Sequence, residues 1–154
     1  MNPHMREAIS EAHTGVKNGD GGPFGAVVVQ NGRVIARGHN TVVRDHDPTC
    51  HAEINAIREA SKVLGRFDLS DCELYTSCEP CPMCYAATYW ARIKTIYRGA
   101  TKKDASSIGF DDEAIYTDLE RPPAAREIPV VELDREAALE PFRAWAEKDD
   151  RVPY

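Results

Sequence analysis

The spacing of apolar and polar residues along the chain predicts helices and strands in alternation. Apolar side chains recur at helical spacing near the N-terminus, which predicts an amphipathic helix over 5–17. The β-rich runs at 24–30 and 33–40 flank Asn31-Gly32, the preferred centre of a two-residue hairpin turn, because both turn positions need a positive φ. The chain therefore begins with a predicted helix and an antiparallel hairpin.

The alternation continues through the rest of the chain. A helical pattern runs through HAEINAIREASKVL to about Leu64, with Asp47 and Thr49 as candidate caps and Gly65 as its stop. The later elements, in chain order, are a strand at 72–77, a helix from about Cys81, a strand at 94–100, a loop at 101–111, a short helix at 112–119, a strand at 128–133 and a last helix at 134–148 with Pro141 in its path.

Strands that alternate with helices imply a three-layer α/β/α domain. The strands at 72–77 and 94–100 are joined by a helix, so they should be parallel with a right-handed crossover. The stretch before 128–133 is too long for a hairpin and contains a helix, so we expect the fifth strand to be parallel as well. The sequence thus predicts a five-stranded mixed sheet whose last strands are parallel, within one domain over 1–154.

The charge balance narrows the class of partner. The net charge is -6, which disfavours nucleic-acid binding, because such binding relies on Lys and Arg to neutralise phosphates, and disfavours anionic membranes. The N-terminus has no apolar core of signal-peptide length, and no stretch approaches the roughly 18 apolar residues of a membrane helix. We therefore expect a cytoplasmic protein with no nucleic-acid or membrane partner.

Cysteine is the first sign of chemistry. The five cysteines are an odd number and three of them fall within seven residues, which favours metal binding or catalysis over a disulfide framework. They are Cys50, Cys72, Cys78, Cys81 and Cys84. Cys50 and Cys72 fit the role of small buried hydrophobic residues better than that of ligands.

Two short motifs, HAE at 51–53 and PCPMC at 80–84, predict a metal site. Cys81 and Cys84 are three residues apart at the start of a helix, so both sulfurs point to one side, and the positive end of that helix favours their thiolates. His51 opens another helix and would be the third ligand. Three protein ligands leave a fourth position for water, which is typical of a catalytic zinc site. We expect one Zn²⁺ per chain.

Glu53 lies two residues after His51 and can reach a zinc-bound water without being a ligand. Zinc brings the pKa of that water to about 7, which gives hydroxide at neutral pH. Glu53 would take the proton of the water, deliver it to a ring nitrogen and then protonate the departing amine. This combination, H-x-E with P-C-x-x-C, is the signature of zinc-dependent base deaminases.

Two other interpretations of the same residues stay open. A closed, non-catalytic structural zinc site would add Cys78 to the three ligands, but it would leave Glu53 without a role. An iron–sulfur site is the second, because bacterial ferredoxins contain C-x-x-C-x-x-C. Here the run lacks the following C-P, and no other cysteine cluster supplies a fourth ligand.

Beyond the zinc motif, the chain resembles the cytidine/deoxycytidylate deaminase superfamily, and within it the small bacterial guanine deaminases. The resemblance covers nearly the whole chain, in GGPFGAVVV (21–29), GHN (38–40), DPTCHAEINAIR (47–58), LYTSCEPCPMC (74–84), YWAR (89–92), GFDD (109–112) and the terminal Tyr154. It implies the three-layer deaminase sandwich, hydrolysis of guanine to xanthine and ammonia in guanine catabolism, and a homodimer. A swap of the segment from Ile128 onward between the two chains is left open.

The resemblance also implies roles in a substrate pocket. Glu53 matches the proton shuttle, and Asp112 matches an acidic group that meets the amino and ring N–H edge of the purine. Asn40 matches the residue that hydrogen-bonds the base. The other matched pocket residues are the aromatic neighbours Phe24 and Trp90, Ala52 beside the zinc histidine, and Tyr154, which closes the pocket. Without the resemblance, Phe24 and Trp90 also fit core positions, and Asp112 also fits a helix cap.

A tRNA adenosine deaminase is the nearest competitor, because it shares the zinc motif. It needs an electrostatic surface for an RNA loop, whereas residues 121–154 contain six Lys and Arg against eight Asp and Glu. Deaminases of guanosine, cytosine or amino-triazines are further alternatives, since these molecules also present an amino group beside a ring nitrogen.

Overall fold

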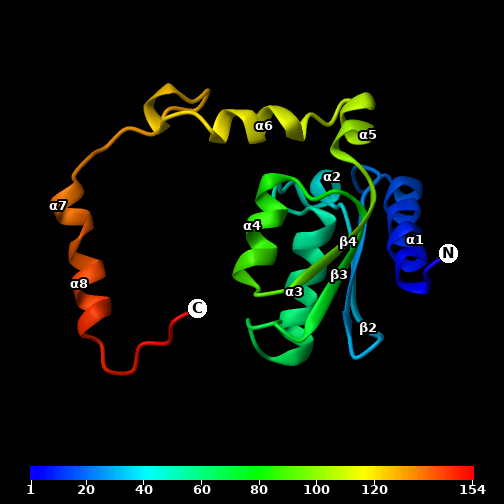
Figure 1. Ribbon diagram of the computed structural model, residues 1–154, viewed down its shortest axis with the longest axis horizontal. Coiled ribbons are helices and arrows are strands. Elements are labelled where there is room, and N and C mark those ends of the chain that lie inside the picture. The colour runs from blue at the N-terminus through cyan, green and yellow to red at the C-terminus, as the bar shows by residue number, and fades with distance from the viewer. The chain divides into compact units, whose positions relative to one another are not determined.

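The structure, a computed structural model, describes residues 1–154, which divide into two compact units, Met1–Glu113 and Ala114–Tyr154. The first unit contains a sheet with helices on both faces (Figure 1). In chain order its elements are α1 (Pro3–Asn18), β1 (Gly25–Gln30), β2 (Arg33–His39), α2 (Val42–Asp45), α3 (Ala52–Leu64), β3 (Cys72–Cys78), α4 (Pro82–Trp90), β4 (Thr95–Ala100), α5 (Lys102–Ser107) and the first residues of α6 (Asp112–Leu119). The prediction of a single domain over 1–154 stays a prediction.

The sheet has the strand order β2-β1-β3-β4 and is mixed, as predicted. Strand β1 runs antiparallel to both β2 and β3, whereas β3 and β4 are parallel. Asn31 and Gly32 have φ values of 50° and 73°, so the predicted hairpin turn is confirmed. The crossover between β3 and β4 contains α4, which brings the two predicted zinc cysteines to the end of the sheet.

The predicted fifth strand at 128–133 is wrong, because the sheet has four strands and this segment forms none. It belongs to the second unit, where Ile128, Val131 and Leu133 are 82%, 80% and 81% exposed. An apolar run makes a strand only where a neighbouring strand supplies hydrogen-bond partners, and the second unit contains no strand.

The two faces of the sheet carry separate hydrophobic clusters, which confirms the three layers. Successive residues of β1 point to opposite faces, so Val27 and Val29 pack with α1, and Ala26 and Val28 pack with α3. Helix α3 presents a row of small buried residues, Ala52, Ala56 and Ala60, to the sheet. Figure 1 shows α1 on one side of the sheet and α3 and α4 on the other.

Helix α3 begins later than the sequence predicts. Its N-cap residue is His51, and neither Asp47 nor Thr49 caps it. The reason is a local turn, in which Asp47 Oδ1 accepts hydrogen bonds from the backbone N and the Oγ1 of Thr49, at 2.8 Å and 2.7 Å. Because Asp47 and Thr49 are engaged in this turn, the N-cap position falls to His51 and the helix starts at Ala52.

The predicted loop at 101–111 contains a short helix, α5. Thr101 accepts a hydrogen bond from the backbone N of Asp104, and the Asp104 carboxylate accepts one from the backbone N of Thr101. This reciprocal capping box stabilises the first turn of a helix, and the sequence interpretation did not use it.

The second unit consists of the rest of α6, the 3₁₀ turn η1 (Pro123–Ala125), α7 (Arg135–Ala138) and α8 (Glu140–Glu147). The predicted last helix at 134–148 is divided in two at Leu139. Pro141 lies in the first turn of α8, where a proline needs no backbone N–H and therefore favours a new helix start. No helix in the structure has the length and apolar character to cross a membrane.

Candidate active site

The three predicted metal ligands lie at the N-termini of two neighbouring helices. His51 is the N-cap residue of α3 and Cys81 is the N-cap residue of α4, while Cys84 follows in the first turn of α4. Both helices lie on the same face of the sheet (Figure 1). Helix N-termini carry a partial positive charge, which favours the thiolate form that a metal ligand requires.

The distances between the ligand atoms fit zinc. His51 Nδ1 lies 3.6 Å from Cys81 Sγ and 3.5 Å from Cys84 Sγ, and all three ligand atoms lie within 4.8 Å of one another. A tetrahedral zinc ion with Zn–N near 2.05 Å and Zn–S near 2.3 Å requires an N···S distance of about 3.6 Å. The geometry and the soft N/S donor set therefore fit a zinc ion held by His51, Cys81 and Cys84.

Protonation of the two ligand thiols is coupled. A hydrogen bond from Cys84 lowers the pKa of Cys81 to about 4, and the same bond, together with burial, raises the pKa of Cys84. A zinc ion would displace the protons of both thiols, because the thiolate is the form that binds metal. The hydrogen bond with Cys81 raises the pKa of His51.

Cys78 does not join the ligand group. It is buried, its Sγ donates to the backbone carbonyl of Thr101 at 3.5 Å, and burial raises its pKa to about 11. The metal-ligating group contains His51, Cys81 and Cys84 alone, so the closed four-ligand site considered from the sequence lacks its fourth ligand. Cys50 and Cys72 are buried, as expected.

Glu53 lies in the first turn of α3, two residues after the metal histidine, and is only 5% exposed. Its Oε1 accepts a hydrogen bond from Thr76 Oγ1 at 3.3 Å. Burial raises the pKa of its carboxyl group, because the charged form loses hydration. A carboxyl group with this surrounding is suited to bind and release a proton during a reaction.

A cavity of about 330 Å³ opens beside His51 and Glu53. This volume lies at the lower end of the range of small-molecule pockets, roughly 300–1,000 Å³. Its walls come from the turn before β1, the segment after β2, the starts of α3 and α4 and the start of α6. The lining residues are Gly22, Phe24, Asn40, Val42, Val43, Pro48, His51, Glu53, Glu79, Cys81, Phe110 and Asp112.

Asn40, just after β2, lines this cavity and is 4% exposed. Its Oδ1 accepts hydrogen bonds from the backbone N of Gly22 at 3.3 Å and of Val42 at 3.2 Å. A Cβ atom on Gly21 would lie 2.1 Å from the same oxygen, so glycine is required there. Because the amide oxygen is held, the side chain is oriented to offer its Nδ2 hydrogens to a ligand.

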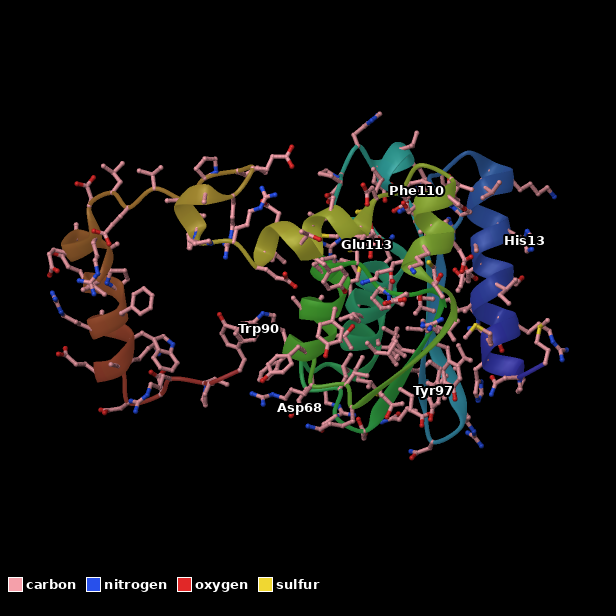
Figure 2. The ribbon with its side chains drawn as sticks, turned by 45° about the horizontal axis from the view of Figure 1, so that its top comes forward. His13, Asp68, Trp90, Tyr97, Phe110 and Glu113 are labelled. Carbon is pink, nitrogen blue, oxygen red and sulfur yellow. The ribbon has the colours of Figure 1, made fainter.

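Phe24 also lines the cavity, and it packs edge-to-face against Phe110 with ring centroids 4.9 Å apart. A Cβ atom on Gly22 would lie 2.9 Å from both rings, so this glycine leaves room for the pair. Phe110 (labelled in Figure 2) lies within the GFDD segment, where no spacing in the sequence marks it as a wall residue.

Two acidic groups complete the wall. Asp112 is the first residue of α6, and burial raises the pKa of its carboxyl group. Glu79 was not predicted. Its Oε2 accepts a hydrogen bond from the backbone N of Lys102 at 3.3 Å and lies 3.7 Å from Arg98 Nε. A glutamate before P-C-x-x-C was visible in the sequence, but nothing in its spacing marked it as a wall residue.

Three predicted pocket residues do not line this cavity. Ala52 is fully buried between the histidine and Glu53. Trp90 is 61% exposed at the end of α4, away from Phe110 (Figure 2). Tyr154 belongs to the second unit and is 73% exposed. Their roles in substrate binding stay predictions.

Comparisons with known proteins place these residues in a family context. Residues 2–100 match the family described as the cytidine and deoxycytidylate deaminase zinc-binding region. The chain is 48% identical to guanine deaminase of Bacillus subtilis (strain 168) over 150 residues, which cover 97% of this chain and 96% of the relative.

The chain is also similar to a solved structure of a guanine deaminase and, over a shorter stretch, to a tRNA-specific adenosine deaminase. The X-ray structure of guanine deaminase from Bacillus subtilis matches with a TM-score of 0.95 and 47% identity, covering 100% of this chain and 99% of that one. The tRNA-specific adenosine deaminase of Bacillus subtilis (strain 168) is 42% identical over 97 residues, which cover 63% of this chain and 60% of that protein.

Proposed function

The chain belongs to the cytidine and deoxycytidylate deaminase family, and from that premise we propose that it is a zinc-dependent guanine deaminase, which hydrolyses guanine to xanthine and ammonia. The observation that carries the proposal is the extent of the similarity to a guanine deaminase. It runs over nearly the whole chain, whereas the similarity to a tRNA-specific adenosine deaminase covers less than two thirds of it.

Zinc held by His51, Cys81 and Cys84 would supply Lewis-acid activation of a water molecule, whose pKa such a site brings to about 7. Proton transfer is then the task of Glu53. Its carboxyl group, which lies 3.3 Å from Thr76 Oγ1, would accept a proton from that water and release it to the ring nitrogen beside the amino group of guanine. The raised pKa of the buried carboxyl group favours the step in which Glu53 holds the proton.

Guanine presents hydrogen-bond acceptors on one edge and donors on another, and the cavity offers a complement for each. The Nδ2 of Asn40 would donate to an acceptor atom of the base, because its Oδ1 is already engaged. Asp112 would accept from the amino and ring N–H edge. Phe24 and Phe110 provide an apolar wall that excludes water from the base.

The proposal also includes the association of two copies of the chain into a homodimer. In it, the segment from Ile128 onward would pack on the partner chain and Tyr154 would close a pocket. Several large apolar side chains of the second unit are exposed, and a partner surface would remove them from water. Sedimentation analysis at micromolar concentration should give twice the mass of the chain, and a monomer would contradict this part alone.

Ammonia release from a substrate panel tests the function. The panel contains guanine, guanosine, adenine, cytosine, an amino-triazine and an RNA anticodon stem-loop with adenosine at its tip. We expect the highest kcat/KM on guanine, with xanthine as the product. The Glu53→Gln protein, purified in the same way, controls for contaminating enzymes. Faster deamination of the RNA loop than of guanine would replace the proposal with the tRNA adenosine deaminase alternative.

A further inference from the structure

A part-buried cluster of one histidine and two carboxyl groups lies at the end of β2, next to Asn40 of the cavity wall. His39 Nδ1 is 3.1 Å from Glu11 Oε2, and His39 Nε2 is 2.8 Å from Asp20 Oδ2. The three side chains are only 15%, 23% and 11% exposed. Each ring nitrogen of His39 therefore lies within hydrogen-bond distance of a different carboxyl group.

The fold leaves room for this ring on α1. A Cβ atom on Gly15 would lie 2.9 Å from His39 Cδ2, so a side chain there would push the ring out of position. His39 therefore joins three parts of the first unit, namely the end of β2, the middle of α1 through Glu11 and the turn after α1 through Asp20.

Asp20 extends the link to the wall of the cavity. Its backbone carbonyl accepts hydrogen bonds from the backbone N of Val43 at 3.1 Å and of Arg44 at 3.0 Å, in the first turn of α2. Val43 lines the cavity, as does Val42, whose backbone N donates to Asn40 Oδ1. Asp20 thus contacts α2 through its backbone carbonyl and through an ion pair with Arg44 at 3.8 Å, and it contacts His39 through its side chain.

Helix α3 holds the two residues that flank Asn40 in the chain, His39 and Thr41. Asn55 Nδ2 donates to the backbone carbonyl of His39 and to Thr41 Oγ1, each at 2.9 Å. The backbone N of Thr41 donates to the carbonyl of Cys50 at 2.9 Å. Asn40 is therefore held between two neighbours whose positions depend on α1, on α3 and on the His39 cluster.

We infer that His39 is a positioning residue for substrate binding. Its contacts with Glu11 and Asp20 hold α2 and the backbone around Asn40, so that the Asn40 amide meets the base in a single orientation. This inference rests on the proposed function, in which Asn40 hydrogen-bonds guanine. His39 itself does not line the cavity and contacts no reacting atom.

Substrate kinetics of His39→Gln test the inference. Glutamine has one donor nitrogen in place of the two ring nitrogens that meet the carboxyl groups, so Asn40 should lose its fixed orientation in the ground state and the transition state alike. We expect KM for guanine to rise about tenfold while kcat changes less than about twofold, the pattern of lost uniform binding. Zinc content should stay at one per chain.

Glu7→Gln is the matched control. Glu7 of α1 pairs with Arg37 of β2, so its loss removes an ion pair between the same two elements, but an exposed one that has no link to the cavity. Its KM and kcat should equal those of the wild type. If His39 served only to hold the fold, His39→Gln would lower the melting temperature and leave KM unchanged, which would overturn the inference.

Asp20→Asn gives an independent test should His39→Gln fold poorly, because the backbone carbonyl of Asp20 remains in place. We expect it to raise KM as well, and the double variant to be no worse than the stronger single one, since the two residues act as a unit. Additive effects on KM would contradict the coupling. If the wild type deaminates guanine and the His39 and Asp20 variants have the same KM, this inference alone is overturned. If the wild type is inactive on every base, the proposed function is overturned with it.

Discussion

The cysteines of this chain take different roles according to the groups that surround them. Cys81 and Cys84 lie at a helix N-terminus beside His51, and a hydrogen bond between them lowers the pKa of Cys81 to about 4. Cys78, three residues before Cys81, is buried against a carbonyl group, and burial raises its pKa to about 11. The position of each sulfur separates ligands from core residues, because Cys81 and Cys84 lie beside His51 whereas Cys78 faces the Thr101 carbonyl.

Metal analysis of two variants tests this distinction. Cys81→Ala removes a ligand, so we expect the loss of zinc and of deaminase activity together. Cys78→Ser, the control in the same segment, should keep one zinc per chain and most of the activity, because Cys78 lies outside the ligand group. Full zinc retention in Cys81→Ala would contradict the assignment, as would loss of zinc from Cys78→Ser.

Glu53→Gln tests the proton-transfer role at the same scale. Glutamine has nearly the shape of glutamate but cannot carry the proton, so zinc content should stay normal while kcat falls by roughly 10²–10⁴-fold, the usual contribution of a general acid–base group. Glu59→Gln, an exposed position on the same helix, should leave kcat unchanged. Turnover of Glu53→Gln at the wild-type rate would remove Glu53 from the mechanism.

At the scale of elements, the position of α3 depends on how closely it approaches β2. Gly38 of β2 makes this approach, because a Cβ atom there would lie 2.6 Å from the carbonyl oxygen of Ala52 and 2.7 Å from the backbone N of Ala56. Backbone atoms cannot move aside as the end of a flexible side chain can. His51 is the N-cap residue of α3 and Glu53 lies in its first turn, so the distance of α3 from the sheet sets the position of the catalytic groups.

Gly38→Ala should therefore damage stability and the metal site together. We expect a loss of roughly 1–3 kcal/mol in the free energy of unfolding, the usual cost of overpacking, together with weaker zinc retention during dialysis against a chelator. Denaturant unfolding measures the first and elemental analysis the second. Arg33→Ala, an exposed change in the same strand, is the control and should alter neither. A Gly38→Ala protein as stable as wild type would show that α3 can shift without cost.

At the scale of the whole molecule, the two units differ in what they contain. Met1–Glu113 includes the sheet, both hydrophobic clusters and the three zinc ligands, whereas Ala114–Tyr154 buries none of its side chains fully. Loss of the last few residues should therefore leave the first unit folded. The tail from Arg151 to Tyr154 can then be tested for function without loss of the fold.

We expect deletion of residues 151–154 to keep zinc, secondary structure and the mass in solution, while guanine turnover falls sharply, because Tyr154 is proposed to close a pocket that must exclude water. Steady-state kinetics, zinc content and sedimentation provide the measurements. Tyr154→Phe keeps the ring and should retain most of the activity if closure is what matters. Unchanged kinetics after the deletion would show that the tail has no part in catalysis.

The sequence alone determined the features that depend on neighbouring residues. The Asn31-Gly32 turn follows from the backbone conformations that the two residues tolerate, and the pairing of Cys81 with Cys84 follows from helical spacing. The zinc ligands and the family could be read from two short motifs, although only the fold brings His51 to the cysteines, 30 and 33 residues away. The alternation of strands and helices gave the three layers and the parallel pair β3 and β4, because a helix between two strands forces a crossover.

Only the tertiary structure decided what depends on a distant partner. The apolar run at 128–133 has the pattern of a strand, but a strand needs a neighbour for its hydrogen bonds, and no pattern within the run shows whether one exists. Phe110 joined the cavity because it meets Phe24, 86 residues earlier in the chain. His39 stands beside Asn40 in the sequence, but its charged partners, Glu11 and Asp20, are 28 and 19 residues away, and only folding brings all three together.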